Sequence, residues 1–97
     1  MRVLLVDGYN VIWATEPYLA LVEHDDWELA RNALISDVAS YVSKECRVTV
    51  VFDGTANPHS DGTPENHIGV TVIYSPYGKT ADAVIERLAA QERERGN

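Results

Sequence analysis

Two runs of branched aliphatic residues, each ending at an aspartate, constrain this chain more than any other feature of its sequence. Arg2–Val6 precedes Asp7, and Arg47–Phe52 precedes Asp53. Continuous apolar runs of this length are typical of strands covered on both faces, as in parallel sheets. A turn is expected over Asp7–Asn10, because Gly and Asn tolerate unusual backbone angles. The sequence therefore predicts an α/β fold whose first two strands each lead into a carboxylate.

The remaining segments complete this layout. A third strand is expected over Gly69–Tyr74, after a long polar loop from Thr55 to Ile68. The clearest helix spans Asp25–Glu45, and a last helix runs from Ala81 to about Arg95. Residues 11–23 fit a short apolar helix or a loop. The order strand, helix, strand, strand, helix favours a parallel sheet flanked by helices.

Capping residues mark the expected helix boundaries. Asp25 is expected to cap the first helix, with Glu28 three residues later in a capping-box arrangement. Thr80 is expected to cap the last helix, and Gly96 to end it. Apolar residues at three- and four-residue steps predict a buried stripe along the first helix: Trp27, Ala30, Leu34, Val38, Tyr41 and Val42.

Composition limits the class of protein. The 97 residues carry 15 Asp and Glu against 8 Lys and Arg, a formal charge of −7. This length suits one small domain over residues 1–97, and the single cysteine excludes a disulfide framework or a Cys-based zinc site. The first apolar run is too short for a signal peptide or a membrane span, so a cytoplasmic protein with no membrane partner is expected. The acidity argues against a broad basic surface for nucleic acid.

Three carboxylates from distant positions are expected at one edge of the sheet. The carboxyl ends of parallel strands share that edge, where ligands bind, so Asp7 and Asp53 meet there, with Asp82 in the first turn of the last helix. Such carboxylates repel one another unless protonated or sharing a cation. Oxygen ligands suit Mg²⁺ or Mn²⁺, which activates water and stabilises a phosphodiester under attack. Asn10 would orient phosphate or water, and Glu86, one turn after Asp82, could face the same side.

Each of these residues also has an ordinary structural interpretation. An aspartate after a strand often forms a turn or caps a helix, and Asp82 near a helix N-terminus is favourable without any function. Glu86 and Lys79 are typical of solvated residues, although Lys79 could contact an RNA phosphate. The sequence has no G-x-G-x-x-G motif and no P-loop, and Tyr9 stands where an aspartyl phosphatase usually has its second aspartate. The three histidines lack metal-ligand spacing and are expected at the surface.

Three motifs occur in one order and span most of the chain: Val6–Ile12 (VDGYNVI), Val50–Asp53 (VVFD), and Gly78–Asp82 (GKTAD) with Val84–Leu88 (VIERL) after it. Together they resemble the YacP-like branch of the NYN domains, within the PIN-like nuclease superfamily. The resemblance implies a Rossmann-like three-layer sandwich with a parallel sheet. It also implies a metal-dependent endoribonuclease.

The resemblance further implies roles for matching residues. Asp7, Asn10, Asp53 and Asp82 would form the acidic catalytic site, in which Asp7 and Asp82 hold Mg²⁺ or Mn²⁺ directly or through water. Asp53 would complete the charge cluster, and Asn10 would position Asp7, water or the scissile phosphate. No protein nucleophile is needed, because metal-bound water attacks. RNA, in a ribosome or translation context, is the implied partner.

The end of the chain departs from the family pattern. Family members continue past the last helix into a fourth strand that brings another acid to the site, whereas this sequence stops at Asn97. We therefore expect residues 1–97 to be the N-terminal part of the domain, with its last strands missing. The missing strand pairs with the first in the family's sheet, so Val3–Val6 would be an open apolar edge. Self-association, as a homodimer or by strand swapping, is therefore expected.

Three hypotheses of function remain at this point. The leading one is a metal-dependent RNA endonuclease. The alternative is a non-catalytic RNA- or ribosome-binding module of the same fold, which the missing acid favours and the crowded carboxylates disfavour. A small-molecule phosphohydrolase, with the Thr55–Ile68 loop as a lid, is the third.

Overall fold

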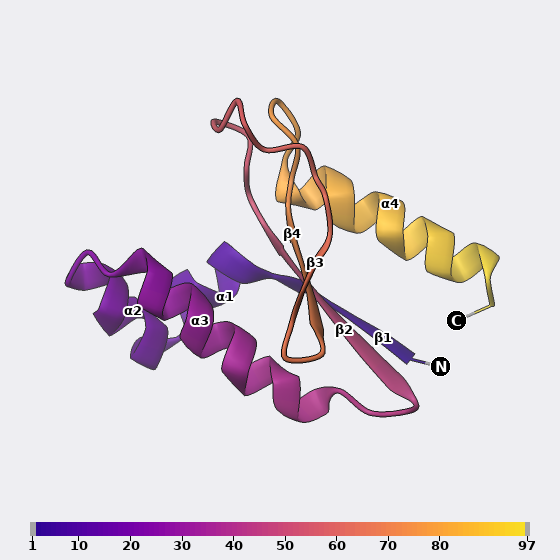
Figure 1. Cartoon of the computed structure of the whole chain (residues 1–97), viewed down its shortest axis with the longest axis horizontal. Helices are drawn as coiled ribbons and strands as arrows, with labels where there is room; N and C mark the ends of the chain where they lie inside the picture. The colour runs from indigo at the N-terminus through magenta and orange to yellow at the C-terminus, as the bar shows by residue number, and fades with distance from the viewer. Residues whose placement is uncertain (1, 97) are drawn as a thin grey trace.

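A four-stranded sheet forms the middle layer of the computed structural model, which describes residues 2–96 (Figure 1). The strands are β1 (Arg2–Asp7), β2 (Cys46–Phe52), β3 (Glu65–His67) and β4 (Val70–Tyr74), in the spatial order β1-β2-β4-β3. Neighbours β1, β2 and β4 are parallel, and β3 is antiparallel to β4. The expected α/β fold with a mostly parallel sheet is therefore confirmed.

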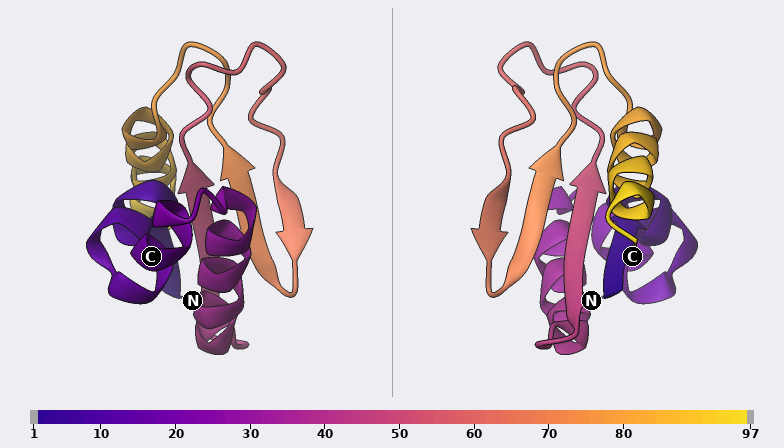
Figure 2. Two further views of the ribbon diagram at one scale, coloured as in Figure 1. Left: turned by 90° about the vertical axis from the view of Figure 1, so that its left-hand side faces the viewer. Right: turned by 90° about the vertical axis from the view of Figure 1, so that its right-hand side faces the viewer.

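Helices cover both faces of this sheet. On one face lie α1 (Gly8–Ala14), α2 (Glu16–Glu23) and α3 (Trp27–Val38), and α4 (Ala81–Glu94) lies on the other. The two side views of Figure 2 show the sheet between these layers. The expected three-layer sandwich is confirmed.

Alternation along the strands divides the core between the two faces. Val50 and Phe52 pack toward α1–α3, whereas Val51, between them, packs with Val84 of α4. Both faces of the strand are thus buried, which is why the sequence of β2 has a continuous apolar run instead of an alternating one.

The register brings the carboxyl ends of β1 and β2 to the same level. Val6 pairs with Val50, and Asp7 pairs with Val51, two residues before Asp53. The chain leaves both strands at this edge, and α4 also begins there after β4. The expected acidic residues therefore lie along this edge.

The segment after β1 differs from the expectation of a turn. Asp7 caps α1, whose first residue is Gly8, and accepts a hydrogen bond from the backbone of Asn10. Residues 11–23 form most of two helices, which separate at the extended Thr15, with Pro17 in the first turn of α2. The predicted turn was wrong because a capping carboxylate lets a helix start directly after a strand.

The ends of α3 also differ from the prediction. Asp26, not Asp25, caps the helix, because its carboxylate accepts from the N–H of Leu29. Asp25 instead has φ 61°, a left-handed conformation that aspartate tolerates better than most residues. The helix ends at Val38 and continues only as a 3₁₀ turn over Ala39–Tyr41.

This early end changes the buried stripe. The Ser40 hydroxyl donates to the carbonyl of Asp37, a local bond that competes with helical pairing, and Val42 is already extended. Tyr41 is therefore 62% exposed instead of buried, whereas Ala30, Leu34 and Val38 are buried as expected.

The predicted loop from Thr55 to Ile68 contains strand β3. All three β3 residues are exposed, so the strand has no apolar pattern by which sequence could indicate it. Ile68 and Gly69, both with positive φ, form the two-residue connection to β4. This hairpin lets β4 run parallel to β2 without a crossover helix.

The C-terminal helix agrees with the prediction. Thr80 caps α4 by accepting from the N–H of Ala83, and Gly96 has the left-handed φ of 79° that favours glycine after a helix. Strand β1 lies at one edge of the sheet that residues 2–96 form. No helix within these residues has the length and apolar character needed to span a bilayer.

Candidate active site

Asp7 is held at the junction of β1 and α1. Its carboxylate accepts 2.9 Å from the side-chain amide of Asn10 and 3.4 Å from the Asn10 backbone N–H. Gly8 is buried at the same junction, and a Cβ there would lie 2.3 Å from the Phe52 ring. The absence of a side chain at Gly8 therefore lets α1 approach β2 and sets the position of Asp7.

Asp53 follows β2 at the same edge of the sheet. Its carboxylate accepts 2.8 Å from the backbone N–H of Thr55, a turn of the kind that aspartate forms without any function. The hydroxyl and backbone N–H of Thr55, together with the backbone of Ala81, hold the pKa of Asp53 below its usual value. These hydrogen bonds favour the ionised form of the Asp53 carboxyl.

Asp82 extends the acidic group from a third element. It is exposed in the first turn of α4, where its charge is favourable near the helix N-terminus. The cap residue Thr80 and the buried Ala81 precede it. The position of Asp82 therefore depends on how the loop before α4 is fixed.

A buried hydroxyl fixes that loop to the loop after β2. The Ser75 hydroxyl accepts 2.8 Å from the N–H of Gly54 and donates 2.7 Å to the carbonyl of Lys79. The Thr55 hydroxyl also donates to the Lys79 carbonyl, at 2.6 Å. A Cβ at Gly54 would lie 2.2 Å from the Ser75 carbonyl oxygen, so the two loops are in close contact. This network ties the segment that follows Asp53 to the loop that precedes Asp82.

These elements surround a cavity of about 320 Å³, which we call the acidic pocket. Its lining contains all four residues of the expected catalytic site: Asp7, Asn10, Asp53 and Asp82. The rest of the lining is Tyr9, Trp13, Thr80 and Ala81. The structure thus brings together residues that are up to 75 positions apart in the sequence (82 − 7).

The two secondary candidates do not line the acidic pocket. Glu86 is exposed one turn further along α4, and the part of Lys79 that is held by the loop network is its carbonyl. The long loop after Thr55 contributes no residue to the lining either. All three histidines are exposed, as expected.

The donor chemistry of the acidic pocket fits a divalent cation only in part. Carboxylates and an amide oxygen are ligands that Mg²⁺ and Mn²⁺ prefer. Within residues 2–96, however, no group of three or more His, Cys, Asp or Glu side chains is close enough to hold a metal ion. Because Mg²⁺ usually keeps several waters and one or two carboxylates, the pocket suits a cation bound partly through water.

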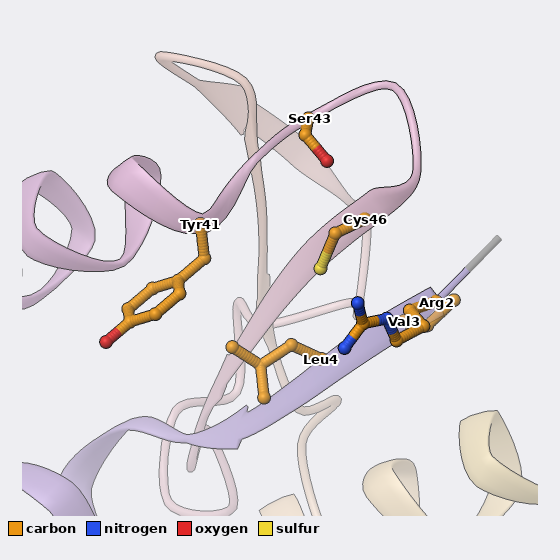
Figure 3. Close-up of a pocket in the computed structure, with 6 residues that line it drawn as sticks. All are labelled: Arg2, Val3, Leu4, Tyr41, Ser43 and Cys46. Carbon is orange, nitrogen blue, oxygen red and sulfur yellow. The ribbon is translucent and has the colours of Figure 1, made fainter.

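A larger cavity, of about 640 Å³, lies away from these acids (Figure 3). It opens between the start of β1 and the chain that enters β2, and its lining is Arg2, Val3, Leu4, Tyr41, Ser43 and Cys46. It has no carboxylate, so the smaller acidic pocket is the better candidate for chemistry on phosphate.

Of the pocket residues that sequence reasoning missed as site residues, Tyr9 and Trp13 have the largest side chains. They lie four positions apart on α1, so they project from one side of that helix beside Asp7 and Asn10. Their i, i+4 spacing would indicate a shared helix face. It could not be used, because residues 11–23 fitted either a helix or a loop and the spacing has this meaning only in a helix.

Comparisons with known proteins agree with this architecture. A family model described as the YacP-like NYN domain matches residues 4–97. The Bacillus subtilis (strain 168) protein named "Uncharacterized protein YacP" is 42% identical over 90 residues, which are 92% of this chain and 52% of that protein. A crystal structure of Rae1 (YacP) from Bacillus subtilis matches with a TM-score of 0.69 at 40% identity, over 92% of this chain and 50% of the other. The chain thus spans about half the length of the relatives it matches.

Proposed function

This chain belongs to the YacP-like NYN domain family, and from that premise we propose that it contributes the active site of a metal-dependent endoribonuclease. The observation that carries the proposal is the acidic pocket, in which Asp7, Asn10, Asp53 and Asp82 from three separate elements line one cavity. Ionised carboxylates next to a polyanion are unfavourable unless a cation lies between them. A site of this kind therefore supports chemistry on RNA phosphate that depends on a divalent ion.

The resemblance to the family implies the metal-binding roles, and the contacts of Asn10 and Asp53 are consistent with supporting roles. Asp7 and Asp82 would hold Mg²⁺ or Mn²⁺. Asp53 would add a negative charge, which the lowered pKa of its carboxyl favours. The Asn10 amide orients the Asp7 carboxylate through the 2.9 Å hydrogen bond. When bound, the cation would supply a reactive water at neutral pH and stabilise negative charge at the scissile phosphate.

Cleavage of a single-stranded RNA with Mg²⁺ or Mn²⁺ tests the proposal. Asp7→Asn should lower the cleavage rate by at least about 100-fold, because the variant loses a charged oxygen ligand. Its fold should survive, since asparagine caps helices as well as aspartate does, and circular dichroism checks this. Glu94→Gln, an exposed acid at the far end of α4, is the matched control and should keep full activity. Full activity in the Asp7→Asn variant would refute the proposal.

The second candidate function is a non-catalytic RNA- or ribosome-binding module. One observation favours it: the carboxylates share a pocket, but no three acids in the described part of the chain form a ready metal site. Intact RNA after incubation with either metal, together with binding that persists in a chelator, would select this candidate. In both cases we propose an RNA partner, in a translation context, and a reducing cytoplasm to which a single free Cys46 is suited.

A further inference from the structure

A second cavity adjoins the acidic pocket and has a different chemistry. It measures about 430 Å³ and is lined by Tyr9, Trp13, Trp27 and Arg31; we call it the aromatic pocket. Its volume falls in the range of roughly 300–1,000 Å³ that is typical of small-ligand sites. Tyr9 and Trp13 line both cavities, so the two form one continuous surface across α1.

The three aromatic rings meet edge to face. Trp13 and Trp27 have ring centroids 5.5 Å apart at 72°, and Tyr9 and Trp27 are 5.7 Å apart at 89°. In each of these contacts the edge of one ring meets the face of the other, so the three rings are not stacked in parallel. Trp13 is 55% exposed, so a large part of its side-chain surface is accessible to a ligand.

Arg31 gives the aromatic pocket a positive charge. Its guanidinium donates 3.4 Å to the hydroxyl of Tyr9. No ion pair between Arg31 and a carboxylate is present within residues 2–96. An arginine held beside aromatic rings without an acidic partner suits an anion such as phosphate.

We propose that the aromatic pocket binds one unpaired base of a single-stranded RNA, stacked against Trp13, with an adjacent phosphate at Arg31. Exposed aromatic faces stack on any unpaired base, whereas bases inside a duplex are already stacked and out of reach. The positive charge of Arg31 and the continuity with the acidic pocket favour RNA over a protein segment as the occupant. The inference rests on the proposed function, because it places the next nucleotide of the same strand at Asp7, Asp53 and Asp82. The site therefore selects single-stranded over duplex RNA.

Intrinsic fluorescence gives a direct test, because Trp13 and Trp27 are the two tryptophans of the chain. A fluorescently labelled single-stranded RNA is titrated into the 97-residue chain carrying Asp7→Asn, in Mg²⁺, with binding measured by anisotropy and by tryptophan quenching. Trp13→Ala should weaken binding by about 5- to 150-fold, the effect of losing one base stack. Trp13→Phe should restore most of it. Arg31→Gln should weaken binding and reduce the salt dependence by about 0.7 in log–log slope.

A control and three outcomes make the test decisive. Tyr41→Ala removes an aromatic residue that is also 62% exposed but lies outside the aromatic pocket, and it should not change binding. Three outcomes would each overturn the inference. The first is equal affinity of Trp13→Ala and its parent for the single-stranded RNA, and the second is equal affinity of the parent for a duplex of the same sequence. The third is burial of the tryptophans by a protein partner or a second copy of the chain instead of by RNA. This experiment measures binding, whereas the Asp7→Asn experiment measures cleavage. Failure of the base-binding proposal therefore does not decide the cleavage proposal, and failure of the cleavage proposal does not decide the base-binding proposal.

Discussion

Replacing Gly8 by alanine should destabilise the fold, although helix propensity alone predicts the opposite. Gly8 is the first residue of α1, where alanine would gain up to about 1 kcal/mol in propensity. The added Cβ would lie 2.3 and 2.5 Å from two Phe52 ring carbons and 3.0 Å from Val50 Cγ1. Favourable carbon contacts lie at about 3.5–4.0 Å, so the overlap exceeds about 1 Å.

The Phe52 ring has little freedom to relieve this overlap. It is fully buried, and its centroid lies 5.0 Å from the Tyr9 ring and 5.3 Å from the Tyr74 ring. Overpacking of this kind costs about 1–3 kcal/mol, and the short contacts indicate the upper end. Subtracting the propensity gain leaves a net loss of about 2 kcal/mol, which lowers the melting temperature by about 8–16 °C in a domain of this size.

Urea denaturation followed by circular dichroism measures the loss, and a double-mutant cycle tests its cause. In the Phe52→Leu background, Gly8→Ala should cost at least about 1 kcal/mol less than in the wild type, because the smaller side chain leaves room for the Cβ. Gly78→Ala is the matched control: it strains a backbone with φ 80° but meets no atom within 4 Å, so its cost should add independently to that of Phe52→Leu. Wild-type stability in Gly8→Ala, or no coupling to Phe52, would refute the steric argument.

Three further predictions test other parts of the structure. Ser75→Ala should cost about 1–3 kcal/mol in urea denaturation, because it leaves the buried N–H of Gly54 without its acceptor; a variant as stable as the wild type would contradict the loop network. Burial and the hydrogen bond to Asp37 raise the pKa of Tyr18 to about 12 from 10.0, so its contribution to stability is complete below pH 10 and is lost as the pH rises toward 12. Tyr18→Phe should make the alkaline loss of stability shallower, and an unchanged pH profile would contradict this. Finally, we propose that the β1 edge makes the chain self-associate at high concentration, with Leu4→Lys restoring a monomer; light scattering that shows a monomeric wild type at every concentration would rule this out.

The elements that sequence predicted well are those whose residues face the core. The runs in β2 and β4 are apolar because both sheet faces are covered there, whereas β1, at the sheet edge, buries only Val6. The cap at Thr80 has a local signal that needs no tertiary information. Strand β3 gave no such signal, since its three residues are exposed and are held only by pairing with β4. The premature end of α3 was equally hidden, because Val42 continues the helical spacing of apolar residues although its backbone is extended.

The same distinction applies to the candidate site. The carboxylates could be predicted to meet, because parallel strands fix where Asp7 and Asp53 emerge. Sequence did not indicate how closely they meet, which depends on loop contacts such as that between Gly54 and Ser75. Trp13 was missed because its relevance depends on α1 being helical, which is a consequence of the Asp7 cap.

The core and the candidate site are coupled through one line of aromatic rings. Tyr74 stacks on Phe52, Phe52 contacts Tyr9, and Tyr9 meets Trp27, which meets Trp13 at the surface. Tyr9 belongs to both pockets, so a shift of Phe52 in the buried layer moves the wall between the acids and the proposed base site. Close packing transmits such shifts because the interior has no free volume to absorb them. Gly8→Ala should therefore weaken single-stranded RNA binding even under conditions where the variant remains fully folded. Ser75→Ala should instead disturb the acidic pocket and leave base stacking unchanged.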